Sequence, residues 1–344
     1  MNLIRDYRSD EATSATFEMR QAMATAEVGD DFNGEDPTVK HLEEMSAEMF
    51  GKEAGLFVIS GTMANQIAIM TSTQHGDEVL VGEESHIYNM ETGALAALSG
   101  VQTRSLRSTD GKFNFKEVER SIRKGGLQFP ATKVLCLENT YDLNLGIPLS
   151  EEYMSELSWI AHKNQLLVYL DGARIFNAAA ALKVDPKILC QGIDVMQFSL
   201  CKGLSAPVGC VLLGTKEFIE GARRMRQRIG GGMSQSGFMA AAGVVALQTM
   251  IQRIQDDHIN AKRLAIGLSN LNKNLVNVEN TLTNIVKVDL RSVKKDAYFM
   301  NNILNKYGIK VKIIDPTTLR LVTHRCITVE DIDETIHVIK HILL

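Results

Sequence analysis

The sequence predicts an α/β protein built on a mostly parallel sheet, followed by a smaller α+β domain. Two observations support this prediction. Between residues 54 and 214, short apolar runs alternate with helical segments in the order strand, loop, helix, which is typical of parallel sheets with helical crossovers. Near residue 246 the pattern changes to one long helical segment, a strand, a helix, two strands and a final helix. We therefore expect a large domain over 1–245, which includes the N-terminal segment, and a small domain over 246–344.

The strands of the large domain are predicted from short runs rich in apolar and β-branched residues that end at glycine or at a polar residue. In chain order they are 54–59, 78–81, 101–106, 132–137, 166–170, 194–200 and 209–214. The small domain adds strands near 284–290, 309–314 and 319–323.

Helices are predicted from apolar residues at helical spacing and from their caps. Pro37 opens a helix whose face carries Val39, Leu42, Met45 and Met49 and which stops at Gly51, and Ser150 caps another in which we expect Trp159 to be a core residue. Further helices are expected at 14–27, after Ser60, around 91–97, at 115–124, 223–228, 239–270 and 295–307, and after Thr328.

Composition excludes some function classes. The chain has 344 residues, is 45% hydrophobic and carries a formal net charge of −4, with no long basic tract, so we expect neither a nucleic-acid nor a membrane partner. No apolar run is long enough for a bilayer span or a signal core. The five cysteines lack the paired spacing of a zinc site or a disulfide framework. We expect a cytoplasmic protein without a metal.

An acidic loop lies at residues 28–37 and contains four carboxylates and two glycines. Such a loop can indicate a divalent cation, but its spacing matches no calcium-binding loop. We expect a turn-rich connection instead.

A strand, the tripeptide Ser60-Gly61-Thr62 and a helix follow one another directly. Backbone N–H groups at a helix start, together with two hydroxyls, favour an anion such as phosphate. The alternative is that Ser60 or Thr62 serves only as an N-cap.

A carboxylate, Asp171, lies at the tip of a fully apolar strand. A buried carboxylate requires a positive partner, and the pyridinium nitrogen of pyridoxal phosphate is one candidate. Arg174 is the other, although its guanidinium could instead bind a substrate carboxylate.

Three further side chains are candidates with a structural alternative each. Lys202 ends an apolar strand, where it could form a Schiff base or simply extend into water. His86 follows a strand at the edge where open α/β sheets bind ligands, yet a single histidine there is often structural. Arg320, between Leu319 and Leu321, is either a carboxylate anchor or an exposed strand residue.

Together, a phosphate-type turn, a strand-end aspartate and a strand-end lysine supply what pyridoxal phosphate needs. The sequence resembles the threonine aldolase branch of the β-eliminating lyases over nearly its whole length. The motifs that carry the resemblance are Arg8-Ser9-Asp10, Val28-Gly29-Asp30-Asp31 with Gly34-Glu35-Asp36-Pro37, Ser60-Gly61-Thr62-Met63-Ala64-Asn65, Ser85-His86-Ile87, Asp171-Gly172-Ala173-Arg174, Lys202-Gly203-Leu204 with Ala206-Pro207-Val208-Gly209, Gly230-Gly231-Gly232-Met233 and Arg320-Leu321-Val322-Thr323-His324.

The resemblance implies the fold of type I pyridoxal-phosphate enzymes, with the cofactor in the large domain. It also implies roles: Lys202 would bind pyridoxal 5'-phosphate as an aldimine, Asp171 would pair with the ring nitrogen, and His86 would stack on the ring. Gly61 and Thr62 would bind the phosphate, and Arg174 would contribute to the cofactor site. The substrate carboxylate would be received by Ser9, Arg174 and Arg320. The implied reaction cleaves or forms a β-hydroxy-α-amino acid of the threonine or allo-threonine type, through a glycine quinonoid, to glycine and an aldehyde.

The chain departs from the family pattern at Glu11, Asn33, Tyr141, Cys201 and Ser234, where relatives commonly have threonine, tyrosine, histidine, serine and arginine. In relatives the histidine at the Tyr141 position lies near the β-hydroxyl of the substrate. We therefore include Tyr141 in the expected catalytic set with Lys202 and His86, although a phenol with a pKa of about 10 is a poor base at neutral pH.

Two alternatives remain open. The first is a sister lyase or transaldolase that uses a different β-substituted amino acid or acceptor aldehyde, and the second is a non-catalytic scaffold subunit. The resemblance also implies a homodimer or homotetramer whose sites lie at subunit contacts, formed by the 30–36 loop and the 230–232 turn.

Overall fold

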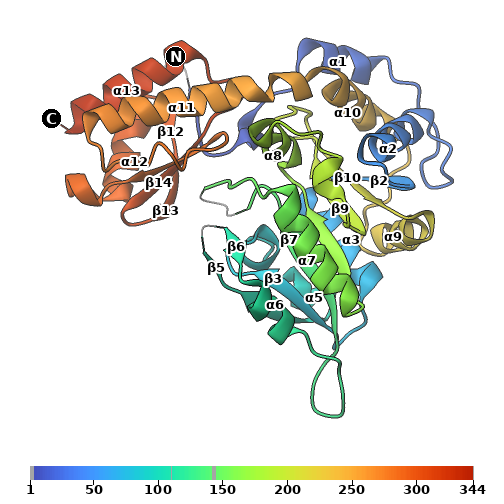
Figure 1. Cartoon of the computed structure of the whole chain (residues 1–344). Helices are drawn as coiled ribbons and strands as arrows, with labels where there is room; N and C mark the ends of the chain where they lie inside the picture. Colours follow the sequence, from blue (N-terminus) through green and yellow to red (C-terminus); the bar gives the residue numbers. More distant parts are fainter. Residues whose placement is uncertain (1–3, 110, 142–144, 344) are drawn as a thin grey trace.

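A seven-stranded sheet forms the centre of the computed structural model, which describes residues 4–109, 111–141 and 145–343 (Figure 1). Its strands lie in the order β2 (Ala54–Val58), β10 (Cys210–Gly214), β9 (Val195–Ser199), β8 (Leu167–Asp171), β7 (Thr132–Glu138), β3 (Glu78–Gly82) and β4 (Gln102–Leu106). Only β10 runs antiparallel to its neighbours. The predicted mostly parallel sheet is therefore present.

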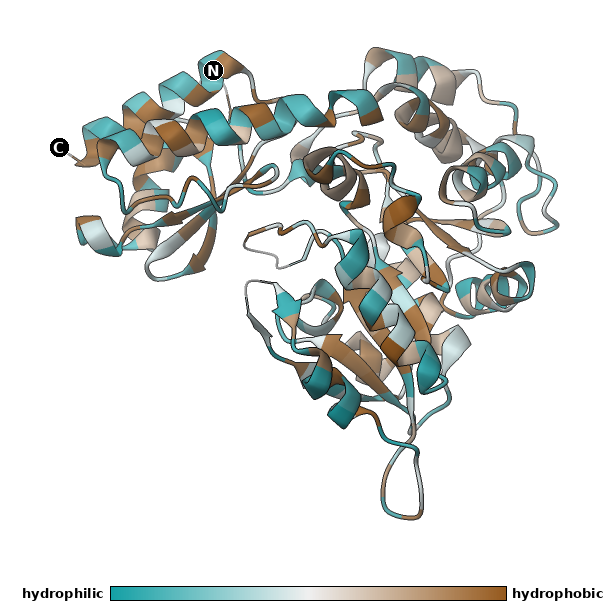
Figure 2. Cartoon of the chain, in the orientation of Figure 1, coloured by the Kyte–Doolittle hydropathy of each residue, from teal (hydrophilic) through white to brown (hydrophobic). Residues whose placement is uncertain are grey.

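Both faces of this sheet are apolar and covered by helices, because alternate residues of each strand point to opposite sides. On one side Phe198 and Leu170 pack with α2 (Pro37–Phe50), α7 (Glu151–Lys163), α8 (Ile175–Leu182) and α10 (Gly237–Thr249). On the other side Val195 and Tyr169 pack with α3 (Gly61–Ser72), α5 (Ala94–Ala97) and α9 (Lys216–Arg228). Figure 2 shows the hydrophobic strands enclosed by helices with hydrophilic outer surfaces.

Shorter elements connect these layers. They are η1 (Asp10–Ala12), α1 (Phe17–Ala24), α4 (His86–Asn89), β5 (Ser108–Thr109), β6 (Lys112–Phe113), α6 (Phe115–Ser121) and η2 (Ile188–Cys190).

A second core lies under the three-stranded antiparallel sheet β11 (Ile285–Asp289), β14 (Thr318–Val322) and β13 (Lys312–Asp315). It is completed by α11 (Ile254–Leu271), η4 (Arg291–Val293), α12 (Ala297–Lys306) and α13 (Val329–Leu343). The N-terminal strand β1 (Arg5–Asp6) pairs with β12 (Ile309–Lys310), and Tyr7 packs in this second core. The first residues described thus pack with the C-terminal part, whereas the sequence predicted that they belong to the large domain.

The single helix predicted over 239–270 is interrupted by η3 (Ile251–Arg253). Its two parts, α10 and η3 with α11, meet at a bend of 53°. No single helix in the described ranges is long and apolar enough to cross a membrane. The bent pair of α10 and α11 reaches that length and apolar composition only when its two helices are counted together.

Trp159 is not a core residue, contrary to the prediction. It lies on the outer side of α7, 56% exposed, with the Lys163 ammonium 4.9 Å from the centre of its ring. The buried face of α7 is formed by smaller apolar side chains, among them Leu157 and Ala161.

Asp36 organises the acidic loop through hydrogen bonds to backbone amides. Its buried carboxylate accepts hydrogen bonds from the amides of Thr38 and Val39, which caps α2, and from those of Gly29 and Gly237 at 3.1 and 3.0 Å. The loop is thereby tied to the start of α10. The predicted turn-rich connection is what these contacts form.

We expect Asp36→Ala to lower the free energy of unfolding by about 3 kcal/mol, because it removes a helix cap and leaves two further amides without an acceptor, that of Gly237 buried and that of Gly29 partly buried. Asn114→Ala is the matched control: Asn114 caps α6 from an exposed position with contacts to two amides of its own helix, so about 1 kcal/mol is expected. Chemical denaturation measures both. Equal losses in the two variants would contradict the additional role of Asp36.

Candidate active site

A cleft opens at the carboxyl ends of the central strands, where open α/β sheets bind their ligands. It is lined by Gly61, Asn65, His86, Glu138, Thr140, Asp171, Ala173, Arg174, Gln197 and Lys202. Five residues predicted from the sequence therefore meet here: Gly61, His86, Asp171, Arg174 and Lys202.

Asp171 is buried and held by three donors. Asn65 Nδ2 and Gln197 Nε2 donate to its carboxylate at 2.9 and 2.6 Å, and the amide of Ala173 donates at 3.0 Å. In the part of the chain that the structure describes, no ion pair reaches this carboxylate. A cationic nitrogen bound in the cleft would complete its environment.

Arg174 does not pair with Asp171, because its guanidinium is bound by Asp10. Nε and Nη2 of Arg174 donate to the two carboxylate oxygens of Asp10 at 2.8 and 2.6 Å. Burial raises the pKa of Asp10, but the attraction of the Arg174 guanidinium outweighs it and holds that pKa well below its usual range. Of the two partners considered for Asp171, the protein itself supplies neither.

Lys202 follows β9 and reaches the same cleft. Its side chain is nearly buried, and its ammonium lies 3.8 Å from the carboxylate of Glu11, one of the positions that depart from the family pattern. The hydroxyl of Thr13 donates to the Lys202 carbonyl at 3.2 Å, which fixes the backbone at this position.

His86 lies at the cleft with its ring oriented by Glu91. Nδ1 is 2.9 Å from the buried Glu91 carboxylate, which also accepts from Asn65 and Gln66 at 2.6 and 2.8 Å. Because a carboxylate only accepts, Nδ1 is the donor, and in the neutral ring Nε2 is then the nitrogen with the free lone pair. Ligand atoms of His86, Glu91 and Asp171 lie within 4.8 Å of one another, but these hydrogen bonds already occupy them.

Glu138 was not among the predicted site residues. It ends β7 directly beside Asp171 on β8 and accepts a hydrogen bond from the His86 amide at 2.7 Å. Burial and then repulsion from Asp171 raise the pKa of Glu138 to about 8. Its position at the tip of a buried strand is the same signal that identified Asp171.

Three other predicted residues, Thr62, Ser9 and Arg320, are not among the residues that line the cleft. Thr62 follows Gly61 in the first turn of α3, where Ser60 is the N-cap and accepts from the Met63 amide at 3.1 Å. Ser9 caps η1 at the N-terminal segment. Arg320 is buried on β14, with Nη1 3.5 Å from the Arg8 carbonyl.

Tyr141 lies outside the residues that line the cleft. Its side chain is fully buried, packs edge-on against Phe113 and donates a hydrogen bond to Glu84 at 2.7 Å. Burial and the Glu84 carboxylate raise its pKa well above the usual value. This geometry does not support the predicted role of Tyr141 at the substrate hydroxyl. Asp142, next in the chain, is outside the described residues.

Glu138 makes stability depend on pH. Its pKa is about 8 in the folded protein and near 4.5 when exposed, so the folded state holds a proton that the unfolded state releases between these values. Stability should fall as pH rises through this window, by up to about 1.4 kcal/mol per pH unit. Unfolding of wild type and Glu138→Gln at pH 5 to 8 tests this: the variant should lose this contribution, and parallel curves would count against it.

A family sequence pattern and several known proteins are similar to this chain over most of its length. The sequence pattern described as "Beta-eliminating lyase" matches residues 6–291. Low-specificity L-threonine aldolase 1 of Arabidopsis thaliana is 40% identical over 344 residues, covering 98% of this chain and 96% of that protein. The low specificity L-threonine aldolase of Escherichia coli K12 is 36% identical, covering 96% of both, and the alanine racemase TOXG of Cochliobolus carbonum is 33% identical, covering 98% and 87%.

Solved structures agree on the fold. A Leishmania major threonine aldolase superimposes with a TM-score of 0.83 at 17% identity, covering 99% of this chain and all of that one. A structure of SPT with PLP gives 0.75 at 18% identity, covering 98% and 87%. The expected type I fold is confirmed. By its sequence and its fold, the chain belongs to the beta-eliminating lyase family.

Proposed function

We propose that this protein is a pyridoxal-phosphate enzyme that cleaves or forms β-hydroxy-α-amino acids of the threonine and allo-threonine type, giving glycine and an aldehyde. The observation that carries the proposal is the buried Asp171 carboxylate, which has three donors but no ion pair among the described residues, in the same cleft as Lys202. The names of the aldolase relatives support the same activity.

The residues of the cleft suit this cofactor. Lys202 would bind it covalently, Asp171 would hold its ring nitrogen protonated, and Gly61 and Thr62 at the start of α3 would bind its phosphate. When bound, pyridoxal phosphate supplies an electron sink for the electrons of the broken Cα–Cβ bond. The ring of His86 would cover one face of it.

Proton transfer is assigned to His86. Glu91 fixes the proton on Nδ1, so Nε2 is available to accept the proton of the β-hydroxyl group. Glu138, whose raised pKa keeps it protonated at neutral pH, would keep a second carboxylate charge away from Asp171. We assign Tyr141 a structural role.

The substrate carboxylate would be received by Arg320 and Ser9, and by the Nη1 side of Arg174. Asp10 already binds Nε and Nη2 of Arg174, so this guanidinium has only part of its donors available. Asp10 therefore positions Arg174.

The sister reaction, with another β-substituted amino acid or aldehyde, is the second candidate. It is favoured by Glu11, whose carboxylate lies 3.8 Å from Lys202, and by the position of Tyr141 outside the cleft. The intact cluster of Lys202, Asp171 and His86 speaks against a non-catalytic scaffold.

We further propose a homodimer or homotetramer with sites completed at subunit contacts. The acidic loop and the segment after the glycine turn lie together, since the Asp31 amide donates to the Ser234 carbonyl at 2.8 Å and the Asp31 carboxylate pairs with Arg226 at 2.9 Å. Phe32 beside them is 52% exposed, as an interface residue would be in one subunit alone.

Five free cysteines favour a reducing compartment such as the cytoplasm.

Acetaldehyde release tests the function. Purified protein supplied with pyridoxal phosphate should release acetaldehyde from threonine or allo-threonine, and Lys202→Ala should lose both this activity and the visible absorbance of the lysine-bound cofactor. Lys216→Ala, at an exposed lysine of α9, is the matched control and should retain both. A normal absorbance band without acetaldehyde would favour the sister reaction, and no cofactor binding would refute the proposal.

Tyr141→Phe separates a structural from a catalytic role. Removal of the hydroxyl should lower the free energy of unfolding by about 1 kcal/mol, since it deletes a buried hydrogen bond to Glu84. Acetaldehyde release should stay within about threefold of wild type, whereas loss of a general base costs about 100-fold or more. A loss of that size at unchanged stability would show that the phenol takes part in the reaction.

A further inference from the structure

Three cations form one row across the small antiparallel sheet. Lys287 on β11 and Lys312 on β13 are the direct neighbours of Arg320 on β14. Because side chains alternate along a strand, Leu319 and Leu321 point into the core beneath the sheet while Arg320 and its two neighbours share the opposite face. Like charges directly across a sheet destabilise it.

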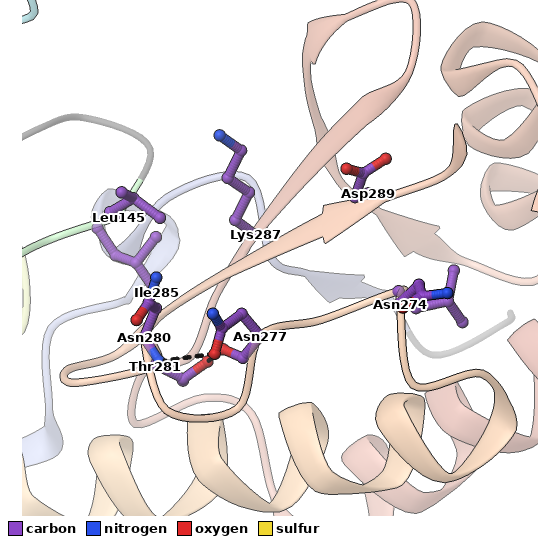
Figure 3. A pocket seen from close by; sticks show the side chains of 9 residues that line it. Leu145, Asn274, Asn277, Asn280, Thr281, Ile285, Lys287 and Asp289 are labelled. Carbon is purple, nitrogen blue, oxygen red and sulfur yellow. Dashed lines mark hydrogen bonds between the residues drawn. The ribbon is translucent and has the colours of Figure 1, made fainter. Parts of the chain in front are cut away.

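Lys287, at one end of the row, has nearby carboxylates. Asp289 and Asp315 both lie within its electrostatic reach. Figure 3 shows Lys287 and Asp289 extending from the same side of β11, beside a hollow of about 260 Å³ that Leu145 and several asparagines line. Lys287 itself is exposed, so water screens its charge at this end of the row, whereas the Asp289 carboxylate is paired with Arg291.

Lys312, at the other end, lies in a different environment. Its side chain is half-buried, and among the described residues it makes no hydrogen bond or ion pair. Burial, together with the charges of Arg320 and Arg174, lowers its pKa, and only the carboxylate of Glu11 acts in the opposite direction. Glu11 is 58% exposed and lies 3.8 Å from the Lys202 ammonium. The carboxylate that attracts Lys312 is therefore the same one that lies beside the Lys202 ammonium.

A half-buried ammonium next to two guanidinium groups is costly unless an anion reaches it. Glu11 is too exposed to neutralise it strongly, and Asp10 is bound by Arg174. An anion from outside the protein, small enough to enter the cleft, would remove this repulsion. The proposed substrate carries such a group.

We propose that Lys312, together with Arg320, forms a carboxylate-binding subsite for the amino-acid substrate on the small sheet. This inference rests on the proposed function. The carboxylate has two possible sources: the α-carboxylate, which every substrate has, or a second carboxylate on the β-substituent. Lys312 would be a substrate-binding residue that sets affinity and specificity without taking part in bond cleavage.

The test compares Lys312→Met, Lys312→Arg and the matched control Lys287→Met, all loaded with pyridoxal phosphate. Glycine is titrated and its Kd is read from the change in cofactor absorbance, and kcat and KM are measured with threonine and with β-hydroxyaspartate. For an α-carboxylate, Lys312→Met should weaken glycine binding about tenfold and raise KM for both substrates, with kcat nearly unchanged.

For a carboxylate on the β-substituent, glycine and threonine should be unaffected while KM for β-hydroxyaspartate rises about tenfold. In either case Lys312→Arg should restore most of the affinity, and Lys287→Met should behave as wild type. The proposal would be overturned if the glycine Kd and both KM values were unchanged in Lys312→Met, or if Lys287→Met weakened binding equally. It would also be overturned if the wild type bound none of the three ligands.

Thermal unfolding separates this role from a structural one. Without substrate, Lys312→Met should have a Tm equal to or above that of wild type, because repulsion from Arg320 and Arg174 is removed. A marked fall in Tm would assign Lys312 a structural role and overturn the proposal. Glycine binding requires no bond cleavage, so a wild type that binds glycine but releases no acetaldehyde would refute the proposed function and leave the subsite supported.

Discussion

The buried ion pair between Asp10 and Arg174 is the interaction on which the active-site geometry depends. It joins the N-terminal segment to the loop after β8, 164 residues away along the chain, and Asn284 of the small part adds a hydrogen bond to Asp10 at 3.3 Å. Breaking such a pair costs about 3–5 kcal/mol, because the remaining charge stays buried. The pair also occupies Arg174, which leaves Asp171 without an ion pair among the described residues.

Two strand-end carboxylates, Glu138 and Asp171, lie side by side yet occupy different environments. Asp171 receives three hydrogen bonds, whereas the donor to Glu138 is one backbone amide. Donors stabilise a charged carboxylate, and burial with few donors favours the protonated form. The protein can therefore hold one negative charge where a cationic ring nitrogen would bind, while keeping its neighbour neutral.

Much of the fold could be predicted from local sequence. The strands of the central sheet begin and end within a few residues of their predicted bounds, because their apolar runs are short, continuous and followed by loops. Trp159 shows the limit of this reasoning, since its helix has a buried face that smaller side chains already fill. The N-terminal strand shows another, because pairing with β12 depends on a segment about 300 residues away.

The sequence by itself supplied the candidate groups at the strand ends: residue type and position singled out Lys202, Asp171, His86 and the turn at Gly61, and the resemblance to the family gave them their expected roles. Only the tertiary structure decided which charges meet, because electrostatic partners are chosen by distance in space. It paired Asp10 with Arg174 and placed Tyr141 in the core against Glu84. It also brought Lys312 beside Arg320, and the Lys312 side chain makes no hydrogen bond or ion pair among the described residues. These pairings determine what the cleft can bind.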